Sequence, residues 1–444
     1  MASIAGARVC FVGHGATLEG AGRYLLDQAG YLADRRATVF AILPRHGPLA
    51  DRLSERGVAV RYAPNPWWAR PVNLTEDHLA HTARAARLMA DIVLQLKVDA
   101  VYTQTIVAPT GAIAAALAGI PHIWHIHEFA FNPGAIEMSV PKEELADLML
   151  QTSNIIVFNS RAVEREWDGM FPSTRTAIAY NWVTPFEVSG ELPSALAGLA
   201  TDDLYMITIV GSIQRWKRQL DAVRAVALLR RRGVPARLLV IGPFVERDYQ
   251  AEIESFVREN GLSDHVQLLG FVDQPARIVS RAHVNVLCSD REPFGRVTIE
   301  SMALGVPVIA TNSGGTPEII EDGESAGGIL FETGNVEALA DSLERLWRDH
   351  TLRTRLAAAA KRRAALFSSA DIAMAPVVEA IQALIGKRNP AWPLGNVLRT
   401  SIAAAREGPD DGVGPSSRLA RMTSVIRRLT SAGASLVARA SREA

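Results

Sequence analysis

Short apolar runs recur along the chain, and longer segments with helical spacing of apolar residues separate them. In the first half these runs are residues 8–12, 38–43, 58–62, 100–103, 122–126 and 155–158. In the second half they are residues 205–210, 237–241, 266–269, 284–287, 307–310 and 328–331. The segments between them, such as 79–96, 220–231 and 336–348, predict helices. Uniformly apolar short runs are typical of parallel strands that helices cover on both faces.

The alternation of strands and helices predicts an α/β protein with two Rossmann-like, doubly wound domains. The rhythm breaks at residues 185–203, which contain prolines and glycines, so we expect domains at 1–190 and 200–370. Residues 387–417 are rich in Pro, Gly and Asn and predict a connector. Residues 417–444 interleave arginines with apolar residues, which fits either a basic amphipathic helix or a disordered tail.

Composition places the chain among ordinary soluble proteins. It has 444 residues, of which 48% are hydrophobic, and its 47 Lys and Arg balance its 47 Asp and Glu. This balance argues against nucleic acid as a partner. Cys10 and Cys288 each follow or lie in an apolar run, so we expect buried thiols rather than a disulfide.

The sequence predicts a cytoplasmic location. Residues 1–13 lack the basic and long apolar parts of a secretory signal. The long apolar stretch 105–126 contains Pro, Gly and His, and is therefore better read as a buried helix and strand than as a membrane span. We expect at most peripheral contact, through the basic tail, with the inner face of the membrane.

The most informative segment, residues 289–310, reads as a loop after a strand, a helix from about Arg296, and another strand. Open α/β sheets bind ligands at the carboxyl ends of their strands. The amides at the start of the helix, beside Gly295, suit a phosphate group. Glu292 is in the loop and Glu300 is one turn inside the helix, so they would contact different parts of one long ligand. Either acid alone could equally be a solvated surface carboxylate.

These residues carry a resemblance to a known family. The Glu-x7-Glu arrangement from Glu292-Pro-Phe-Gly to Glu300-Ser-Met-Ala, with Gly314-Gly315-Thr-Pro-Glu after it, closely resembles retaining GT-B-type glycosyltransferases of family 4. The resemblance implies two domains facing across a cleft, with a helix at 371–386 that returns to the first domain. It also implies a nucleotide diphosphate sugar as donor, retention of the anomeric configuration, and no cofactor or metal.

The resemblance assigns roles in the donor loop. Glu292 would contact the donor sugar, and Glu300 would hold the ribose. Gly295, Arg296 and Val297 would offer amides to sugar and phosphate, beside Phe294. The glycine pair before Pro-Glu could equally be no more than a tight strand-to-helix turn.

A second loop, residues 210–219, has three cations close together at the end of a strand, after Gly211. They could neutralise a diphosphate, although a solvated basic turn would show the same pattern. Lys217 matches the family's lysine. Ser212 stands where the family has a basic residue and Arg218 where it has glycine, and Arg215 is the candidate substitute for the missing base.

The first half contributes a glycine-rich turn and a histidine. The resemblance implies that Gly20 and Gly22 face the donor phosphates. A glycine-rich turn could also belong to a dinucleotide-binding site, but the acidic residue that such a site needs after the second strand is missing. The resemblance also implies that His127 lines the sugar pocket beside Glu128. A metal site on His125 and His127, or two structural histidines, are the alternatives.

Taken together, we expect transfer of a sugar to an acceptor hydroxyl in glycan, polysaccharide or glycolipid synthesis, with Glu292, Lys217 and His127 as catalytic residues. The acceptor would be a carbohydrate or a lipid-linked molecule held by the first domain. Two alternatives use the same scaffold: a nucleotide-sugar epimerase, and a sugar-nucleotide-binding protein without turnover, which the serine at position 212 motivates.

Overall fold

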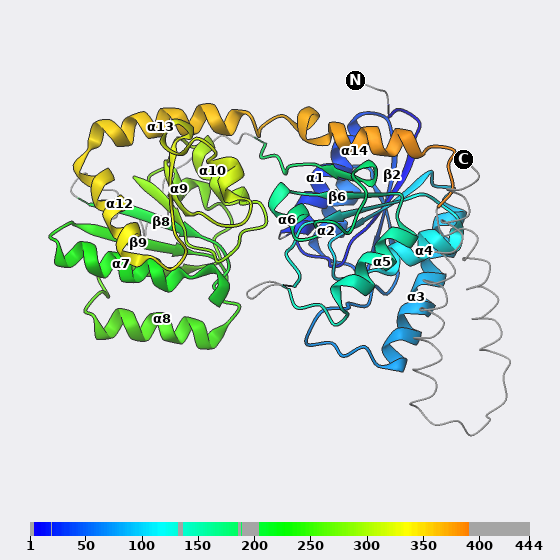
Figure 1. The fold of residues 1–444 in the computed structure, drawn as a ribbon, viewed down its shortest axis with the longest axis horizontal. Coiled ribbons are helices and arrows are strands. Elements are labelled where there is room, and N and C mark those ends of the chain that lie inside the picture. The colour runs from blue at the N-terminus through cyan, green and yellow to red at the C-terminus, as the bar shows by residue number, and fades with distance from the viewer. Residues whose placement is uncertain (1–3, 19, 132–135, 185–187, 189–203, 390–444) are drawn as a thin grey trace.

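The computed structural model describes residues 4–18, 20–131, 136–184, 188 and 204–389. These residues form two α/β domains side by side (Figure 1). The predicted linker, 185–203 apart from Val188, and the tail beyond residue 389 lie outside the described residues.

The N-terminal domain has a parallel seven-stranded sheet in the order β3-β2-β1-β4-β5-β6-β7. Its strands are β1 Arg8–Val12, β2 Thr38–Leu43, β3 Ala59–Tyr62, β4 Ala100–Gln104, β5 His122–Ile126, β6 Ile155–Phe158 and β7 Thr176–Ile178. The α-helices are α1 Ala21–Asp34, α2 Pro48–Glu55, α3 Glu76–Gln95, α4 Thr110–Ala118, α5 Lys142–Thr152 and α6 Arg161–Arg165, and a 3-10 turn η1 covers Ser173–Arg175.

The C-terminal domain repeats the plan with a parallel six-stranded sheet in the order β10-β9-β8-β11-β12-β13. Its strands are β8 Tyr205–Val210, β9 Ala236–Ile241, β10 Val266–Gly270, β11 Val284–Leu287, β12 Val308–Thr311 and β13 Gly328–Phe331. Its helices are η3 Arg215–Lys217, α7 Gln219–Arg231, α8 Arg247–Glu259, α9 Ala276–Val279, α10 Arg296–Ala303, α11 Thr316–Ile319, η4 Gly323–Ala326, α12 Val336–Arg348 and α13 His350–Ala365.

In each sheet the first strand of the domain lies near the centre, and the strand order reverses beside it. This reversal lies between β1 and β4 in one sheet and between β8 and β11 in the other. Ligands of open α/β sheets bind in the crevice at such a reversal. The two-domain α/β prediction is therefore confirmed, and each candidate loop starts at the carboxyl end of a strand. Strand β7 was not predicted, because its three residues, Thr-Ala-Ile, are too few to form an apolar run. All three are only partly buried.

Helix α14, Ala370–Leu384, belongs in space to the N-terminal domain although it follows the C-terminal one (Figure 1). Its buried Met374, Val377 and Ile381 join the apolar cluster that contains β1 and β2. By length and composition alone, α13 and α14 together could cross a membrane. In the structure this apolar face of α14 is instead part of a domain core.

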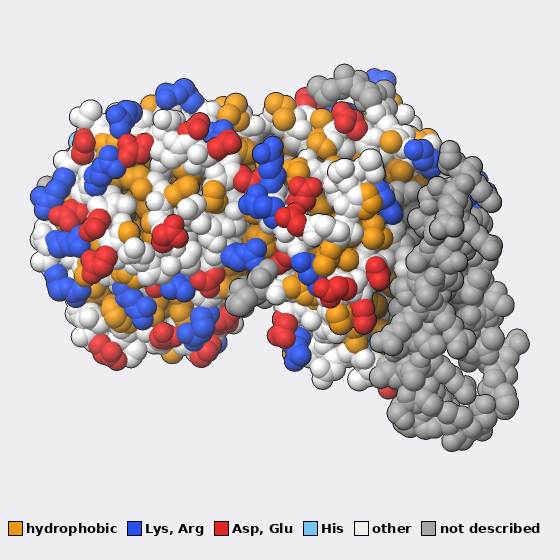
Figure 2. All heavy atoms as spheres, in the orientation of Figure 1, with side chains coloured by type: hydrophobic (Ala, Val, Ile, Leu, Met, Phe, Trp, Pro, Cys, Tyr) orange, Lys and Arg blue, Asp and Glu red, His pale blue; other side chains and the backbone are white. Residues whose placement is uncertain are grey.

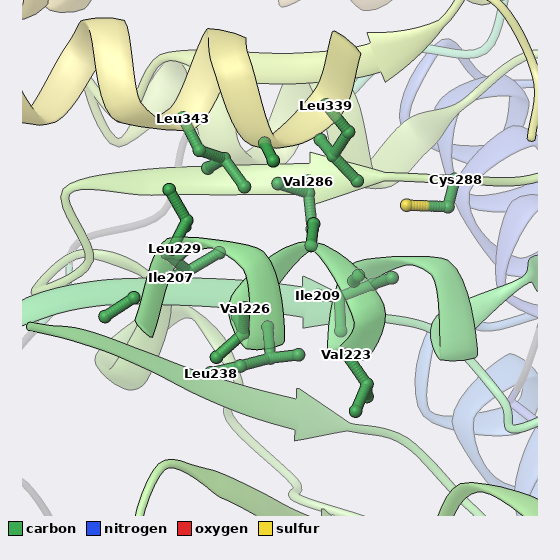
Figure 3. Packing of buried hydrophobic residues seen from close by; sticks show 14 of the residues in the cluster. Ile207, Ile209, Val223, Val226, Leu229, Leu238, Val286, Cys288, Leu339 and Leu343 are labelled. Carbon is green, nitrogen blue, oxygen red and sulfur yellow. The ribbon is translucent and has the colours of Figure 1, made fainter. Parts of the chain in front are cut away.

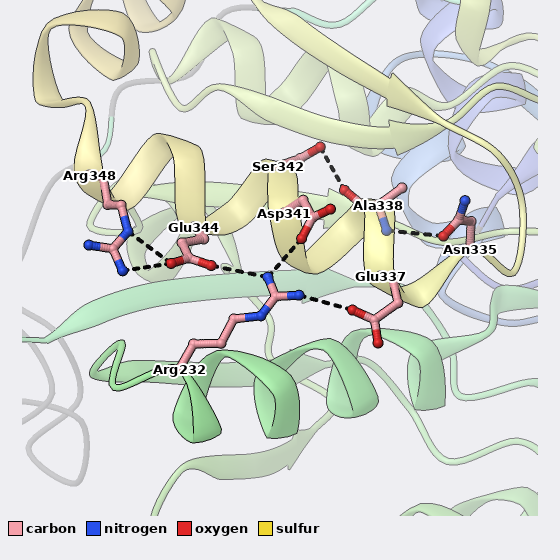
Figure 4. A network of polar contacts seen from close by, with 8 residues as sticks. All are labelled: Arg232, Asn335, Glu337, Ala338, Asp341, Ser342, Glu344 and Arg348. Carbon is pink, nitrogen blue, oxygen red and sulfur yellow. Dashed lines mark hydrogen bonds and ion pairs between the residues drawn. The ribbon is translucent and has the colours of Figure 1, made fainter.

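The core of the C-terminal domain lies between its sheet and helices α7 and α12. Ile207, Val286 and Val226 are fully buried there, with Leu339 above them (Figure 3). On the outside, Arg232 at the end of α7 bonds three carboxylates of α12 (Figure 4). These contacts are exposed and contribute little beyond fixing the two helices side by side.

Both cysteines are free and buried, as predicted, and they lie in different domains. Burial raises the pKa of the Cys10 thiol to about 12 and also raises the pKa of Cys288. Neither thiol is ionised at neutral pH, which is the behaviour of inert core residues. Figure 2 shows acidic and basic side chains interspersed over the visible face.

Candidate active site

The loop between β11 and α10 forms the centre of the candidate site. The Glu292 carboxylate lies 2.5 Å from the Lys217 ammonium and accepts a 3.1 Å hydrogen bond from the Ser289 hydroxyl. The Lys217 and Glu292 side chains are only 15% and 14% exposed. Two residues that the sequence predicted separately are therefore one partly desolvated ion pair.

The Lys217 loop follows β8, and its geometry explains the arginine where the family has glycine. Arg218 has φ of 52°, a left-handed conformation that glycine adopts without strain. Its guanidinium bonds Asp221 at 2.7 Å and Asp290 at 3.1 Å, which compensates for the strained backbone. The Asp290 amide also donates to the Trp216 carbonyl at 2.8 Å, so the two loops are joined.

Arg215 does not join this pair. Its exposed side chain bonds Glu252 at 2.6 Å and Asp248 at 3.3 Å, both on α8. Ser212 donates to Gln214, also within the loop. The cation that meets Glu292 in this structure is therefore Lys217, whereas Arg215 is paired with α8.

The glycine pair after β12 is required by close packing against the donor loop. A Cβ at Gly314 would lie 2.2 Å from the Glu292 carbonyl oxygen, and one at Gly315 would lie 2.5 Å from that of Pro293. The Gly315 amide donates to the Glu292 carbonyl at 2.7 Å. The pair is thus more than a turn, because it fixes the backbone that carries Glu292.

Helix α10 starts at Gly295, whose φ of 104° turns the chain into the helix. Its first amides have no earlier helical carbonyl to bond, so this end favours an anion. The Phe294 ring is 2% exposed and stacks on Tyr180 in the core. Phe294 therefore packs, and any donor contact of this residue would come from its backbone.

A pocket of about 370 Å³ opens beside α10. Val297, Glu300 and Val210 line it, together with Arg23 of α1 and the segment at 273–277 after β10. Burial raises the pKa of Glu300, while Arg296 at 3.7 Å lowers it. The lining segment after β10 was not predicted from the sequence, although its place at the end of a predicted strand was a usable signal.

Arg296 connects the two domains. Its guanidinium lies 3.3 Å from the Asp27 carboxylate of α1 as well as 3.7 Å from Glu300. Burial raises the pKa of Asp27, and Arg296 counteracts this shift. One cation therefore serves two partly buried acids, one from each domain.

His125 and His127 lie at the carboxyl end of β5 in the N-terminal domain. His127 is 8% exposed, and its ring lies 4.0 Å from that of His125. Burial, then the charges of His14 and Arg296, lower the pKa of His127 to about 3, so its imidazole is neutral at pH 7. Among the described residues nothing bonds its buried Nε2. A buried polar atom without a protein partner is suited to a ligand hydroxyl.

The pKa of Glu128, the residue after His127, is also shifted. Glu128 accepts hydrogen bonds from the amides of Ile106 and His127, each at 3.2 Å. Burial outweighs these bonds and raises the pKa of Glu128 to about 7. The three-residue metal alternative gains no support, because no group of three His, Cys, Asp or Glu that could hold a metal occurs in the described part of the chain.

Gly20 and Gly22 stand at the start of α1. Gly20 has φ of 48° and precedes the helix, and a Cβ at Gly22 would lie 2.2 Å from the Thr17 carbonyl. Both glycines therefore shape the turn after β1. The first side chain of this helix to reach the pocket is Arg23.

Glu318, which follows the glycine pair, docks the N-terminal domain. Its carboxylate accepts from the amides of Arg161 at 3.0 Å and Ala162 at 2.7 Å, and from the Tyr180 hydroxyl at 2.8 Å. Nearby, the Ser160 hydroxyl donates to the Pro293 carbonyl at 2.6 Å. Glu318 belongs to the Gly-Gly-Thr-Pro-Glu motif, and this docking role was not predicted from the sequence.

Comparisons with known proteins agree with this geometry. Residues 197–363 match the family Glycosyl transferases group 1, and residues 19–182 match the Glycosyl transferase 4-like domain. N-acetyl-alpha-D-glucosaminyl L-malate synthase of Bacillus anthracis is 34% identical over 155 residues, 35% of this chain and 39% of the relative. The lipopolysaccharide core biosynthesis glycosyltransferase LpsE of Rhizobium meliloti is 29% identical over 40% of this chain and 64% of its own length. The matches thus span less than two thirds of these relatives.

Solved structures match over nearly the whole described chain. Anabaena HepE in complex with UDP superposes with a TM-score of 0.69 at 20% identity, covering 85% of this chain and 100% of HepE. A glycosyltransferase from Rickettsia africae superposes with a TM-score of 0.71 at 18% identity, covering 85% and 98%.

The two facing parallel sheets define a GT-B fold. With the matches in both domains, the chain belongs to the group 1, family 4-like glycosyltransferases.

We expect the packing of Gly314 to be essential for the donor loop. Gly314→Ala would press a Cβ against the Glu292 carbonyl, whereas Gly323→Ala, at a similar φ of 55°, would meet open space. Both variants should lose about 1–2 kcal/mol to left-handed strain. Only Gly314→Ala should lose more stability and show faster hydrogen exchange across residues 289–296. Equal melting temperatures and equal exchange in the two variants would contradict this role.

Proposed function

We propose that the protein transfers a sugar from a nucleoside diphosphate sugar to an acceptor hydroxyl, in polysaccharide or glycolipid synthesis. The observation that carries the proposal is the Lys217–Glu292 pair, whose acid is in the loop that leads into α10, the helix whose Glu300 lines the first pocket. Anabaena HepE binds UDP and UDP-glucose on the same fold, which supports a nucleotide sugar as donor. Relatives named for lipopolysaccharide core and diphospho-undecaprenol substrates support a carbohydrate or lipid-linked acceptor.

The chain offers a distinct group for each part of such a donor. Glu300 holds the ribose in the pocket beside α10, and Lys217 with the first amides of α10 neutralises the diphosphate. Glu292 accepts from the hydroxyls of the donor sugar. His127, neutral and with a free Nε2, bonds the sugar from the opposite domain. Fixed charges of this kind stabilise a leaving diphosphate without reorganisation.

The proposal includes retention of the anomeric configuration. It is supported by the resemblance of the Glu292–Glu300 and Gly314–Gly315 motifs to retaining enzymes. NMR of the new glycosidic bond measures this directly, and an inverted anomer in the product would refute it.

Three variants of the donor site should each lose affinity or turnover with a different set of ligands. Glu300→Gln should weaken nucleoside, nucleoside diphosphate and full donor alike. Lys217→Ala should weaken the diphosphate and the donor but not the nucleoside. Glu292→Gln should leave diphosphate binding equal or tighter, because it frees Lys217, and should lower turnover. Each lost charge-assisted contact costs about 1.5–3 kcal/mol, roughly tenfold to a hundredfold.

Calorimetry with nucleoside, diphosphate and donor on each variant separates these outcomes, starting with uridine compounds. A folding defect would weaken all ligands in all three variants. If the three substitutions leave donor binding and turnover within about twofold of wild type, the donor site is elsewhere.

We also expect turnover without a divalent metal. The sequence lacks an Asp-x-Asp pair at the end of a strand, and Lys217 with the α10 amides can take the metal's electrostatic role. Activity should therefore survive EDTA. Complete loss, restored by Mn²⁺ or Mg²⁺, would refute metal independence.

The basic tail supports a further part of the proposal, a cytoplasmic enzyme held at the inner membrane face. Residues 417–444 contain arginines at 418, 421, 427, 428, 439 and 442. We expect the full chain to sediment with anionic vesicles at low salt and to be released at high salt. A chain ending at residue 387 should stay in solution and keep its turnover on a soluble acceptor. Equal sedimentation of both chains would reject the membrane contact.

A further inference from the structure

A second pocket of about 360 Å³ is lined by residues of both domains. Lys142, Ala162, Arg165 and Glu166 line it from the N-terminal domain, and Arg291 and Gly314 line it from the C-terminal one. It shares no lining residue with the pocket beside α10. It is therefore a separate place in the cleft.

The charges of this pocket are predominantly positive, since three cations face one carboxylate. That carboxylate, Glu166, is 1% exposed and already engaged, because it accepts from the Ala130 amide at 3.0 Å and lies 3.8 Å from Arg291. Lys142 donates to the Glu166 carbonyl. Arg165 is exposed and has no ion pair with any described residue. Among the described residues that line the pocket, cations therefore outnumber carboxylates three to one.

Arg291 separates this pocket from the donor site. Its guanidinium lies 3.8 Å from the centre of the Phe129 ring, on the N-terminal domain. The next residue, Glu292, points its carboxylate to Lys217 of the C-terminal domain. Consecutive side chains of this loop thus contact opposite domains. The stacked guanidinium is held in a plane from which it can bond an anion in two places.

We propose that this pocket binds an anionic group of the acceptor, a phosphate or a carboxylate, through Arg291, Arg165 and Lys142. The inference rests on the proposed function. Gly314 lines the pocket and packs against the Glu292 carbonyl, so a bound acceptor lies directly beside the donor loop. A neutral sugar acceptor would leave Arg165 without an ion-pair partner among the described residues, and Arg291 with Glu166 alone. An anionic acceptor compensates the charge of these arginines and is oriented by it.

The test uses the full chain with its donor site saturated by nucleoside diphosphate, and inorganic phosphate or succinate as the probe. Chloride holds the ionic strength constant. Calorimetry should show that Arg165→Ala weakens binding of the preferred probe, and that Arg165→Ala with Lys142→Ala weakens it at least about tenfold. Arg161→Ala removes the same charge from the same helix but outside the pocket, and should bind the probe like wild type.

Tighter binding of phosphate indicates a phosphorylated acceptor, and tighter binding of succinate indicates a carboxylate. Either result supports the proposal when the pocket variants lose it. Absence of binding of both probes to wild type, or equal binding to wild type and the double variant, would overturn it. Nucleoside diphosphate affinity is recorded for every variant. If wild type binds no nucleoside diphosphate, the proposed function fails instead, which is a separate result.

Discussion

The ion pair between Lys217 and Glu292 is the interaction around which the rest of the candidate site is arranged. It joins the loop after β8 to the loop after β11, at the place where the strand order of the sheet reverses. With both side chains about one-seventh exposed, neither charge is well solvated, so removing one would leave the other unpaired. The pair therefore holds the site together before a ligand arrives. On the proposed function, it would also present the diphosphate with a cation that is already in place.

The supports of this pair come from one short motif. Gly314 and Gly315 allow the chain after β12 to lie against the backbone at Glu292 and Pro293, where a Cβ would collide. Glu318, a few residues later, accepts hydrogen bonds from two amides and a hydroxyl of the opposite domain. The same motif thus shapes the donor loop and docks the N-terminal domain on it. Glycine and glutamate therefore each have a structural role in this motif.

Much of the fold could be predicted from the sequence, because buried parallel strands are marked by uninterrupted apolar runs. Strands β1, β2, β5, β6, β8, β11 and β13 have the predicted bounds. The candidate site was predictable where a loop directly follows such a strand, as for Glu292 and Lys217. It was not predictable where the direction of a side chain decides the role. Arg215 turns to α8, and the Phe294 ring turns into the core. Nor could Arg291 and Arg165 be placed together, since only the docking of two domains does so.

The electrostatics of the cleft depend on which groups are charged when it is empty. His127 and His125 have pKa values far below neutral, so the histidines add no positive charge at pH 7. Arg296 is already shared by Asp27 and Glu300, one acid from each domain. On the proposed reaction, the charge of a departing diphosphate must therefore fall mainly on Lys217 and the amides of α10. A donor ribose bonded to Glu300, as proposed, would alter the partner of Arg296, so donor binding would be coupled to the contact between the domains.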